Sequence, residues 1–274
     1  MRRSSFVLIL AALTLFPRSA AGDSTRPEIS PPPLSEIRPQ HGEAYIWYLL
    51  HTGHAVRTET KLLIFDYIST RRHNPVEPSV RSISHGWINP EEIKDLDVYV
   101  FVSHSHTDHF DSTIFTWQNT VPNITYFFGW DAAEGSRYHN LVGPRATYSD
   151  STITIHTINS HHSGVPEVAY LVQTDGLAIY HGGDYNSDYE NDVAYLCTHV
   201  DQLDIAMLND WCGDPILEVI NRLKPRLVFP GHFGDKEHEP RRLPGCVCQG
   251  PESFCTLHCP THRGEMFHYA GASQ

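Results

Sequence analysis

The stretch "VFVSHSHTDHF", residues 100–110, places His104, His106, Asp108 and His109 close together directly after a run of apolar residues. A buried loop of this composition cannot satisfy its polar groups without partners. His104 and His106 are two positions apart, so at the end of a strand both can face the same side. Asp108 and His109 follow where the chain turns, and can face a neighbouring spot. Imidazole and carboxylate together suit zinc, manganese or iron, so the stretch predicts half of each of two adjacent metal sites.

The remaining ligands should also lie at strand ends. Three further places show an apolar run that stops where a His or Asp stands beside glycine, whose missing side chain allows close backbone approach. They are His161 or His162 in "NSHHSG", Asp184 in "YHGGDY" and His232 in "FPGHFG". Adjacent strand residues point to opposite faces, so we expect only one of the two neighbouring histidines to bind metal, and favour His162.

The rest of the pattern alternates strands with short helices. Asn89 with Pro90, and Asp214 with Pro215, are typical starts of helices. The Asp175-Gly176 pair predicts a tight hairpin. We expect helices over 89–96, 111–119 and 214–225, and strands over 43–50, 60–68, 97–104, 123–129, 151–159, 167–184 (interrupted by the hairpin), 203–210 and 226–232.

Composition divides the 274 residues into four segments. The N-terminus has Arg2 and Arg3, an apolar run over 6–16 and small residues at 19–21, the layout of a secretory signal peptide whose apolar run is too short for a permanent anchor. A proline-rich stretch follows. We expect a signal peptide over 1–21, a surface arm over 22–42, one folded domain over 43–235 and a loop-like, cysteine-rich tail over 236–274.

Charge and hydropathy restrict the partners. The formal net charge is −12, which repels nucleic acid, and no later segment has about 18 uninterrupted apolar residues. We therefore expect an exported protein, periplasmic or secreted, cleaved near Ala21, with a small-molecule substrate, no nucleic acid and no membrane anchor. The oligomeric state stays open.

Four of the six cysteines cluster in the tail. In an exported protein such clustering predicts two disulfides, and the alternative is a small zinc site helped by His258 or His262. Spacing alone does not decide the connectivity. The clustered cysteines are Cys246, Cys248, Cys255 and Cys259.

The ordered set "HSHTDH", then a His, an Asp and a final His resembles the metallo-β-lactamase superfamily over residues 43–235. The opening "HTGHAVRTETKLLIFD" is similar to the ascorbate-phosphate-lactonase-like and N-acylphosphatidylethanolamine-phospholipase-like branches. The resemblance implies an α/β (α+β) fold, a four-layer αββα sandwich with metals at one edge. It also implies two divalent ions, zinc first, with manganese or iron as alternatives.

The resemblance implies two sets of metal ligands when the family's ligand roles are assigned to the matching residues of this chain. One metal would be held by His104, His106 and His162, and the other by Asp108, His109 and His232. Asp184 would bridge them, and Asp108 would orient a hydroxide and accept a proton, so Asp108 and Asp184 are the candidate catalytic residues.

Four further residues are candidates for the surroundings of the metals. His54 follows Gly53 and is either a donor to a metal ligand or an ordinary strand histidine. Asp66 ends a strand and is expected to hold the metal loops by hydrogen bonds. Tyr185 and the histidine of the 161–162 pair that does not bind metal could contact substrate.

Three functions follow. The leading hypothesis is an exported dinuclear metal-dependent hydrolase acting on a small ester, lactone or phosphodiester through a metal-bridging hydroxide. The alternatives are a mononuclear-iron oxygenase on the same fold and a non-catalytic, metal-stabilised binding protein of the cell envelope.

Overall fold

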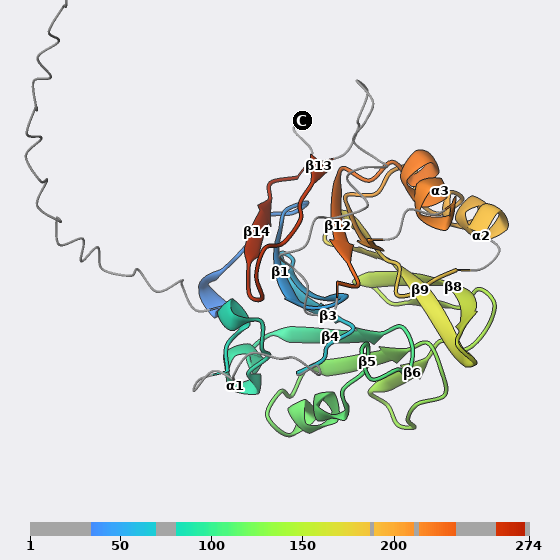
Figure 1. Ribbon diagram of the computed structural model, residues 1–274. Coiled ribbons are helices and arrows are strands. Elements are labelled where there is room, and N and C mark those ends of the chain that lie inside the picture. Colours follow the sequence, from blue (N-terminus) through green and yellow to red (C-terminus); the bar gives the residue numbers. More distant parts are fainter. Residues whose placement is uncertain (1–33, 70–80, 187–188, 211–213, 234–255, 272–274) are drawn as a thin grey trace, which may run out of the picture. The chain divides into compact units, whose positions relative to one another are not determined.

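The computed structural model describes residues 34–69, 81–186, 189–210, 214–233 and 256–271. Their strands form two seven-stranded sheets (Figure 1). The first sheet has the order β14-β1-β2-β3-β4-β5-β6, with strands β1 (Ala44–Leu50), β2 (Gly53–Arg57), β3 (Lys61–Phe65), β4 (Asp97–Val102), β5 (Ile124–Phe128), β6 (Tyr138–Asn140) and β14 (Met266–Tyr269). The second has the order β13-β12-β11-β10-β9-β8-β7, with strands β7 (Thr147–Ser149), β8 (Ile153–His162), β9 (Val165–Thr174), β10 (Leu177–His181), β11 (Ile205–Asn209), β12 (Leu227–Gly231) and β13 (Thr256–Leu257).

Alternating residues of the strands separate three apolar cores. Between the sheets lie side chains such as Phe65, Phe101 and Tyr170. The outer face of the first sheet packs against α1 (Pro90–Ile93) and the 3-10 helices η1 (Leu34–Glu36), η2 (Ile83–His85) and η3 (Ser112–Asn119). The outer face of the second sheet packs against α2 (Tyr189–Leu196) and α3 (Asp214–Leu223) (Figure 1). These layers confirm the expected four-layer sandwich.

The helix starts follow from local capping. The Asn89 side chain accepts a hydrogen bond from the N–H of Glu91, and Pro90 occupies the first turn of α1. Asp111 caps the next helix in the same way, by accepting from the N–H of Thr113. That helix is a 3-10 helix rather than an α-helix, and α1 spans a single turn. On the first sheet the helical layer is therefore built of short pieces.

Both flanking segments contribute to the fold. Leu34 and Ile37, in the segment expected to be a surface arm, are buried in the core outside the first sheet. In the segment expected to be loop-like, β13 pairs with β12 and β14 pairs with β1, so each sheet gains an edge strand. The cysteine cluster lies outside the described residues apart from Cys259, and so does the predicted signal peptide over residues 1–21.

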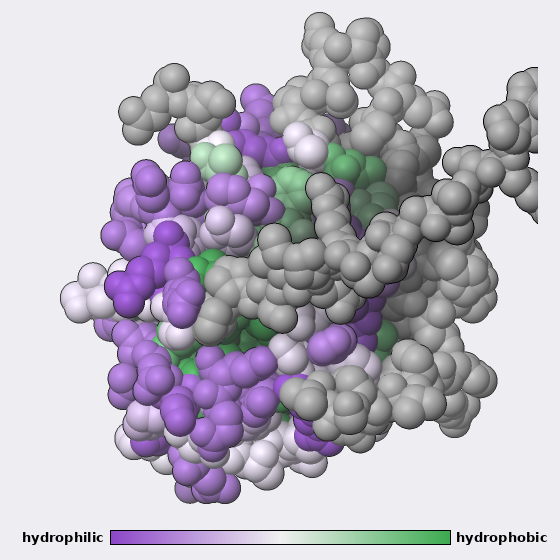
Figure 2. Space-filling model, turned by 90° about the vertical axis from the view of Figure 1, so that its left-hand side faces the viewer, coloured by the Kyte–Doolittle hydropathy of each residue, from purple (hydrophilic) through white to green (hydrophobic). Residues whose placement is uncertain are grey.

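The described surface is mainly polar. One face of the molecule is largely hydrophilic, with apolar residues showing between the polar ones (Figure 2). Val142 and Met266 are the exposed large hydrophobic residues of the described part of the chain. No helix in that part is long and apolar enough to cross a membrane.

Candidate metal centre

The candidate ligands come from the ends of four strands in the two sheets. His51 follows β1, the stretch from His104 to His109 follows β4, Asp184 follows β10 and His232 follows β12. Parallel pairing brings carboxyl ends together within each sheet: those of β3 and β4 in the first, and those of β10, β11 and β12 in the second. The ligand groups contain residues from both sets, so the two sets of strand ends lie at the same edge of the sandwich. Residues far apart in the sequence therefore meet there.

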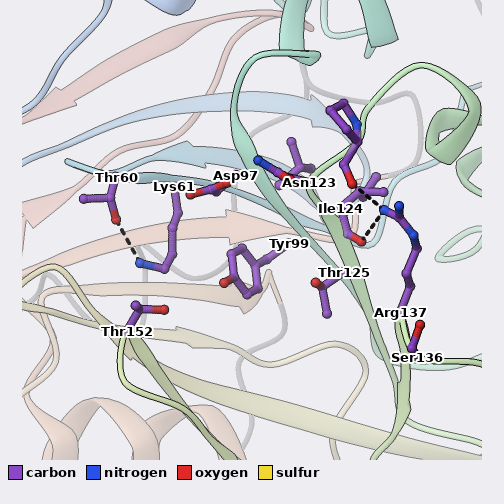
Figure 3. A pocket seen from close by; sticks show the side chains of 12 residues that line it. Thr60, Lys61, Asp97, Tyr99, Asn123, Ile124, Thr125, Ser136, Arg137 and Thr152 are labelled. Carbon is purple, nitrogen blue, oxygen red and sulfur yellow. Dashed lines mark hydrogen bonds between the residues drawn. The ribbon is translucent and has the colours of Figure 1, made fainter.

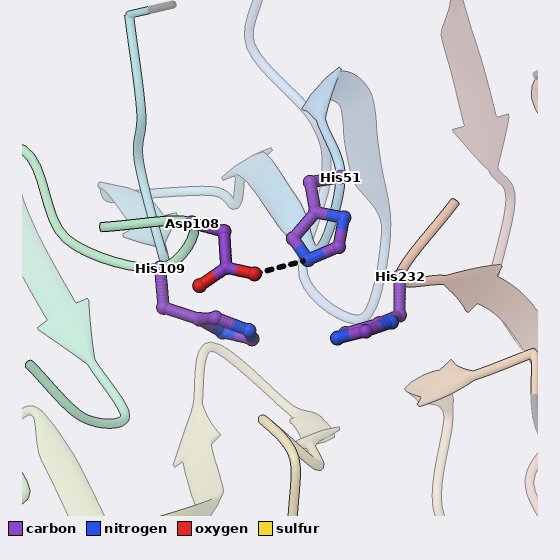
Figure 4. A group of neighbouring side chains, drawn as sticks. All are labelled: His51, Asp108, His109 and His232. Atoms are coloured by element: carbon purple, nitrogen blue, oxygen red, sulfur yellow. Dashed lines mark ion pairs between the residues drawn. The ribbon is translucent and has the colours of Figure 1, made fainter. Parts of the chain in front are cut away.

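One group of possible ligands comprises His51, Asp108, His109 and His232, whose ligand atoms lie within 4.8 Å of one another. Their side chains point toward a common space (Figure 4). His51 Nε2 lies 3.5 Å from Asp108 Oδ2, and the rings of His51 and His232 are 4.2 Å apart. His51 and His109 are buried, whereas Asp108 and His232 are partly exposed. The group is therefore open to solvent on one side.

A second group comprises His104, His109 and Asp184, again within 4.8 Å. All three side chains are buried. Asp184 Oδ1 lies 3.4 Å from His109 Nε2, and its Oδ2 lies 3.2 Å from His232 Nε2. Asp184 thus belongs to the second group and also lies beside His232 of the first group. Its role as a bridging ligand stays a prediction.

Burial and mutual charge set the protonation of these groups. Burial, and then the neighbouring His109, lower the pKa of His104 to about 3. Burial also opposes a charge on His109, but the carboxylates of Asp184 and Asp66 outweigh it and raise its pKa to about 10. Burial would raise the pKa of Asp184, yet His109 and His232 hold it well below its usual range. An anionic carboxylate between histidines favours binding of a cation.

A carboxylate behind the ligands orients His109. Asp66 Oδ2 accepts a hydrogen bond from His109 Nδ1 at 2.7 Å, which directs Nε2 toward Asp184. Asp66 also accepts from the backbone N–H and the hydroxyl of Ser103, each at 2.7 Å. Asp66 therefore holds the metal loop by hydrogen bonds, as the sequence predicted.

Glu167 is a second supporting carboxylate. It is fully buried, accepts a hydrogen bond from the backbone N–H of Asp184, and has Oε1 3.4 Å from His104 Nδ1. Gly183 allows this approach: its φ is +53°, and an added Cβ would lie 2.9 Å from Glu167 Oε1. Asn209 Nδ2 donates to Asp184 Oδ1 at 3.1 Å from the other side.

The structure does not place every predicted ligand in a group. Among the described side chains, His106 belongs to neither group; its ring lies 4.7 Å from that of His104. His161 and His162 end β8, opposite Pro166 and Val165, but their side chains lie outside what is described. The choice between these two histidines stays a prediction.

His54 and Tyr185 lie away from the ligand groups. His54 Nδ1 is hydrogen-bonded to the Thr52 carbonyl at 3.0 Å, and its buried ring packs between Tyr48 and Phe229. It is the ordinary strand histidine of the two alternatives. The Tyr185 hydroxyl donates to Asp192 at 2.6 Å in the helical layer, and its contact with substrate stays a prediction.

Sequence reasoning missed His51 and Glu167. His51 carries the signal used for the other ligands, because it ends the apolar run of β1 two residues before Gly53. His54, directly beside Gly53, shows the same pattern and was chosen instead. Glu167 carried no signal, since its role depends on pairing between β8 and β9 and on the fold of residues 182–184.

The residues fit a divalent metal. Buried His109 Nε2 has no hydrogen-bond partner among the described residues, and imidazole and carboxylate groups converge around it. Imidazole nitrogens and carboxylate oxygens are ligands of zinc, manganese and iron. The clusters therefore define a metal-binding site, with His109 and Asp184 between its two halves.

Comparison with known proteins agrees with this fold. A family model for the beta-lactamase superfamily domain matches residues 45–232. The chain belongs to this superfamily.

Individual relatives are distant. The chain is 24% identical over 226 residues to the UPF0173 metal-dependent hydrolase TK0141 of Thermococcus kodakarensis, covering 77% of this chain and 90% of the relative. The structure of Igni18, a metallo hydrolase from Ignicoccus hospitalis, superposes with a TM-score of 0.59 at 15% identity, covering 83% of this chain and 98% of Igni18. CmlA, a diiron beta-hydroxylase from Streptomyces venezuelae, gives a TM-score of 0.58 at 10% identity, covering 85% of this chain and 55% of CmlA. The two solved structures show the shared fold.

Proposed function

We propose that this chain is an exported, dinuclear metal-dependent hydrolase of a small ester, lactone or phosphodiester. The observation that carries the proposal is the position of Asp184, which belongs to the buried group with His104 and has Oδ2 3.2 Å from His232 Nε2 of the more exposed group. A carboxylate so placed can contact two ions at once. The metal-dependent hydrolase of Thermococcus kodakarensis supports the reaction class.

Different residues would hold the two ions. His104 and Asp184 would bind the buried ion, joined by the predicted His106 and His162. His51, Asp108 and His232 would bind the more exposed ion, with His109 between the groups. Two divalent ions, zinc first, would supply Lewis acidity and a hydroxide nucleophile near neutral pH.

The chain's own residues account for orientation and proton handling. Asp66 and Glu167 fix His109 and the Asp184 backbone, so the ligands are held before any ion arrives. Asp108 is partly exposed and lies beside His51, so its carboxylate can accept a proton at the solvent side of the site. The contact with His51 outweighs burial and holds the pKa of Asp108 well below its usual range, so this carboxylate is anionic at neutral pH and, as a proton acceptor, a weak base.

The test combines metal analysis with a substrate screen. The full chain, exported and purified without chelator, should contain two metal ions per molecule. It should hydrolyse one of bis-p-nitrophenyl phosphate, a lactone or a nitrophenyl ester in a chelator-sensitive way. Asp184→Asn and His232→Gln should lose metal and at least about 10²-fold of turnover, the scale expected for a disabled metal site. His41→Gln, an exposed histidine beside Glu59, is the matched control.

The outcomes separate the alternatives. Unchanged hydrolysis in Asp184→Asn contradicts the proposal. One iron per chain with oxygen-dependent turnover supports the oxygenase, the reaction class closer to that named for CmlA. Bound metal with no turnover of any class supports a binding protein. Retention of the N-terminal segment by protein recovered from the exporting compartment contradicts cleavage near Ala21.

A further inference from the structure

A second cavity, of about 600 Å³, lies at the other end of the sandwich from the metal ligands. It is lined by the first residues of β3, β4 and β5, the residues before β6 and the turn before β8. Lys61 begins β3, and Asp66 follows the end of the same strand. At about 3.3 Å per residue, the backbone positions of Lys61 and Asp66 are about 16 Å apart along this strand. No residue of the cavity belongs to the ligand groups.

Two cationic side chains face this cavity across Tyr99 (Figure 3). The Lys61 side chain is only 4% exposed; its Nζ donates to Thr60 Oγ1 at 2.8 Å and lies 3.8 Å from Asp175 Oδ1. An ammonium group has three donors, so these partners leave donor capacity directed at the cavity. Asp175 already supplies an anion beside this ammonium group, so Lys61 offers a ligand a hydrogen-bond donor rather than an uncompensated charge.

Arg137 supplies the second cation. Its Nη1 donates to the carbonyls of Pro122 and Ile124, at 2.6 and 3.3 Å, which fixes the plane of the guanidinium group. Arg137 makes no other side-chain hydrogen bond to the described residues. Its Nε and Nη2 can therefore donate to another acceptor. A fixed guanidinium with a free edge matches carboxylate or phosphate oxygens.

Aromatic and hydroxyl groups complete the lining. The half-buried Tyr99 ring stacks on Phe127, with centroids 6.2 Å apart, so the ring is held from behind. Thr125, Ser136 and Thr152 add hydroxyl groups at the cavity wall. Asp97 is the one acidic residue of the lining, against Lys61 and Arg137. Asp175 pairs with Lys61, so Arg137 is the cation of this lining that has no carboxylate beside it among the ion pairs of the described residues.

We propose that this cavity binds a small organic anion, with its carboxylate or phosphate group on Arg137 and Lys61 and its apolar body against Tyr99. The volume falls within the range of about 300–1,000 Å³ typical of small-molecule sites. The cavity is separate from the metal ligands, so the molecule bound in it is a second ligand and not the substrate that is hydrolysed. It stands whether or not the hydrolase proposal holds.

The site is tested by titrating the metal-loaded full chain with one ligand at a time and recording NMR spectra at each step. The ligands are phenylphosphonate, benzoate and the neutral benzyl alcohol. Both anions should bind and shift the amide signals of Tyr99 and Ile124, and benzyl alcohol should bind much more weakly. Arg137→Gln and Lys61→Gln should each weaken anion binding about tenfold or more, as expected for loss of a charged hydrogen bond. Arg222→Gln and Lys94→Gln, which remove exposed cations paired with Glu218 and Glu91, are the matched controls.

The arms of the experiment separate the outcomes. Tighter phosphonate binding identifies a phosphate ester as the ligand class, and tighter benzoate binding identifies a carboxylic acid. Equal binding of benzyl alcohol overturns the proposal, as does unchanged affinity in both cavity variants. If Lys61→Gln unfolds, Arg137→Gln decides alone, because the Arg137 side chain is only half-buried.

Discussion

Asp66 Oδ2 accepts a hydrogen bond from His109 Nδ1 at 2.7 Å, and both side chains are fully buried. The contact fixes which ring nitrogen of His109 faces Asp184. The same carboxylate binds Ser103, the residue before His104. One buried acid therefore orients both ends of the loop that carries the metal ligands.

Asp66→Asn should lower metal affinity by about 10- to 100-fold, because an amide orients the imidazole less firmly and makes it less basic. Competition with a coloured chelator measures the affinity. Asp175→Asn is the matched control: Asp175 is a similarly hydrogen-bonded acid, held by Thr58 and Thr60 beside Lys61. Equal metal affinity in Asp66→Asn and the wild-type protein contradicts the role assigned to Asp66.

Exchange of His51 should reduce metal binding, whereas exchange of His54 should not. His51→Ala should reduce the bound metal, because His51 belongs to the more exposed ligand group. His54→Ala should leave the metal content per folded chain unchanged, since its ring packs between Tyr48 and Phe229. Elemental analysis of both variants decides. Loss of metal only in His54→Ala would reverse the assignment.

Glu167 variants should separate folding from metal binding. Glu167→Gln keeps an acceptor for the Asp184 N–H, so the chain should fold while binding metal less tightly. Glu167→Leu leaves that buried N–H unpaired and should cost about 1–3 kcal/mol of unfolding free energy. Urea denaturation and chelator competition measure the two effects. Equal stability of the two variants would show that the hydrogen bond contributes little.

Phe101→Ala should destabilise the fold by about 3–5 kcal/mol, as for other buried aromatic truncations. Phe101 is fully buried between the sheets, where it stacks on Phe65 and Phe127 with centroids 4.7 and 5.1 Å away. Val142→Ala, at a residue 52% exposed, should change stability by less than about 0.5 kcal/mol. Urea unfolding curves compare the two variants.

The His156–His199 pair should make stability depend on pH. The rings stack with centroids 3.7 Å apart, and burial, then His199, lower the pKa of His156 from 6.5 to about 4. The unfolded chain takes up a proton on His156 near pH 6.5, but the folded chain does so only near pH 4. The stability from neutral His156 is therefore present above about pH 6.5 and lost as the pH falls toward 4.

His156→Gln should accordingly lose less stability than the wild-type protein between pH 6.5 and 4. Urea unfolding at several pH values measures the difference between the two curves, which removes the contribution of other histidines. Parallel curves across this range would contradict the low pKa of His156.

Much of the fold could be predicted from sequence. Apolar runs placed most of the strands, and caps at Asn89 and Asp111 placed two helix starts, because these signals act over a few residues. The edge strand β14 was not predicted, since it has four residues with one buried side chain and becomes a strand only by pairing with β1.

The sequence by itself determined that histidines and aspartates gather at strand ends, because an apolar strand that stops at a ligand residue is a local pattern. It thereby determined Asp108, His109, Asp184 and His232 as candidate ligands. Only the tertiary structure decided that His51 rather than His54 joins them and that Glu167 supports Asp184. Those roles depend on which strands lie beside each other, and burial of apolar faces across distant parts of the chain decides that arrangement.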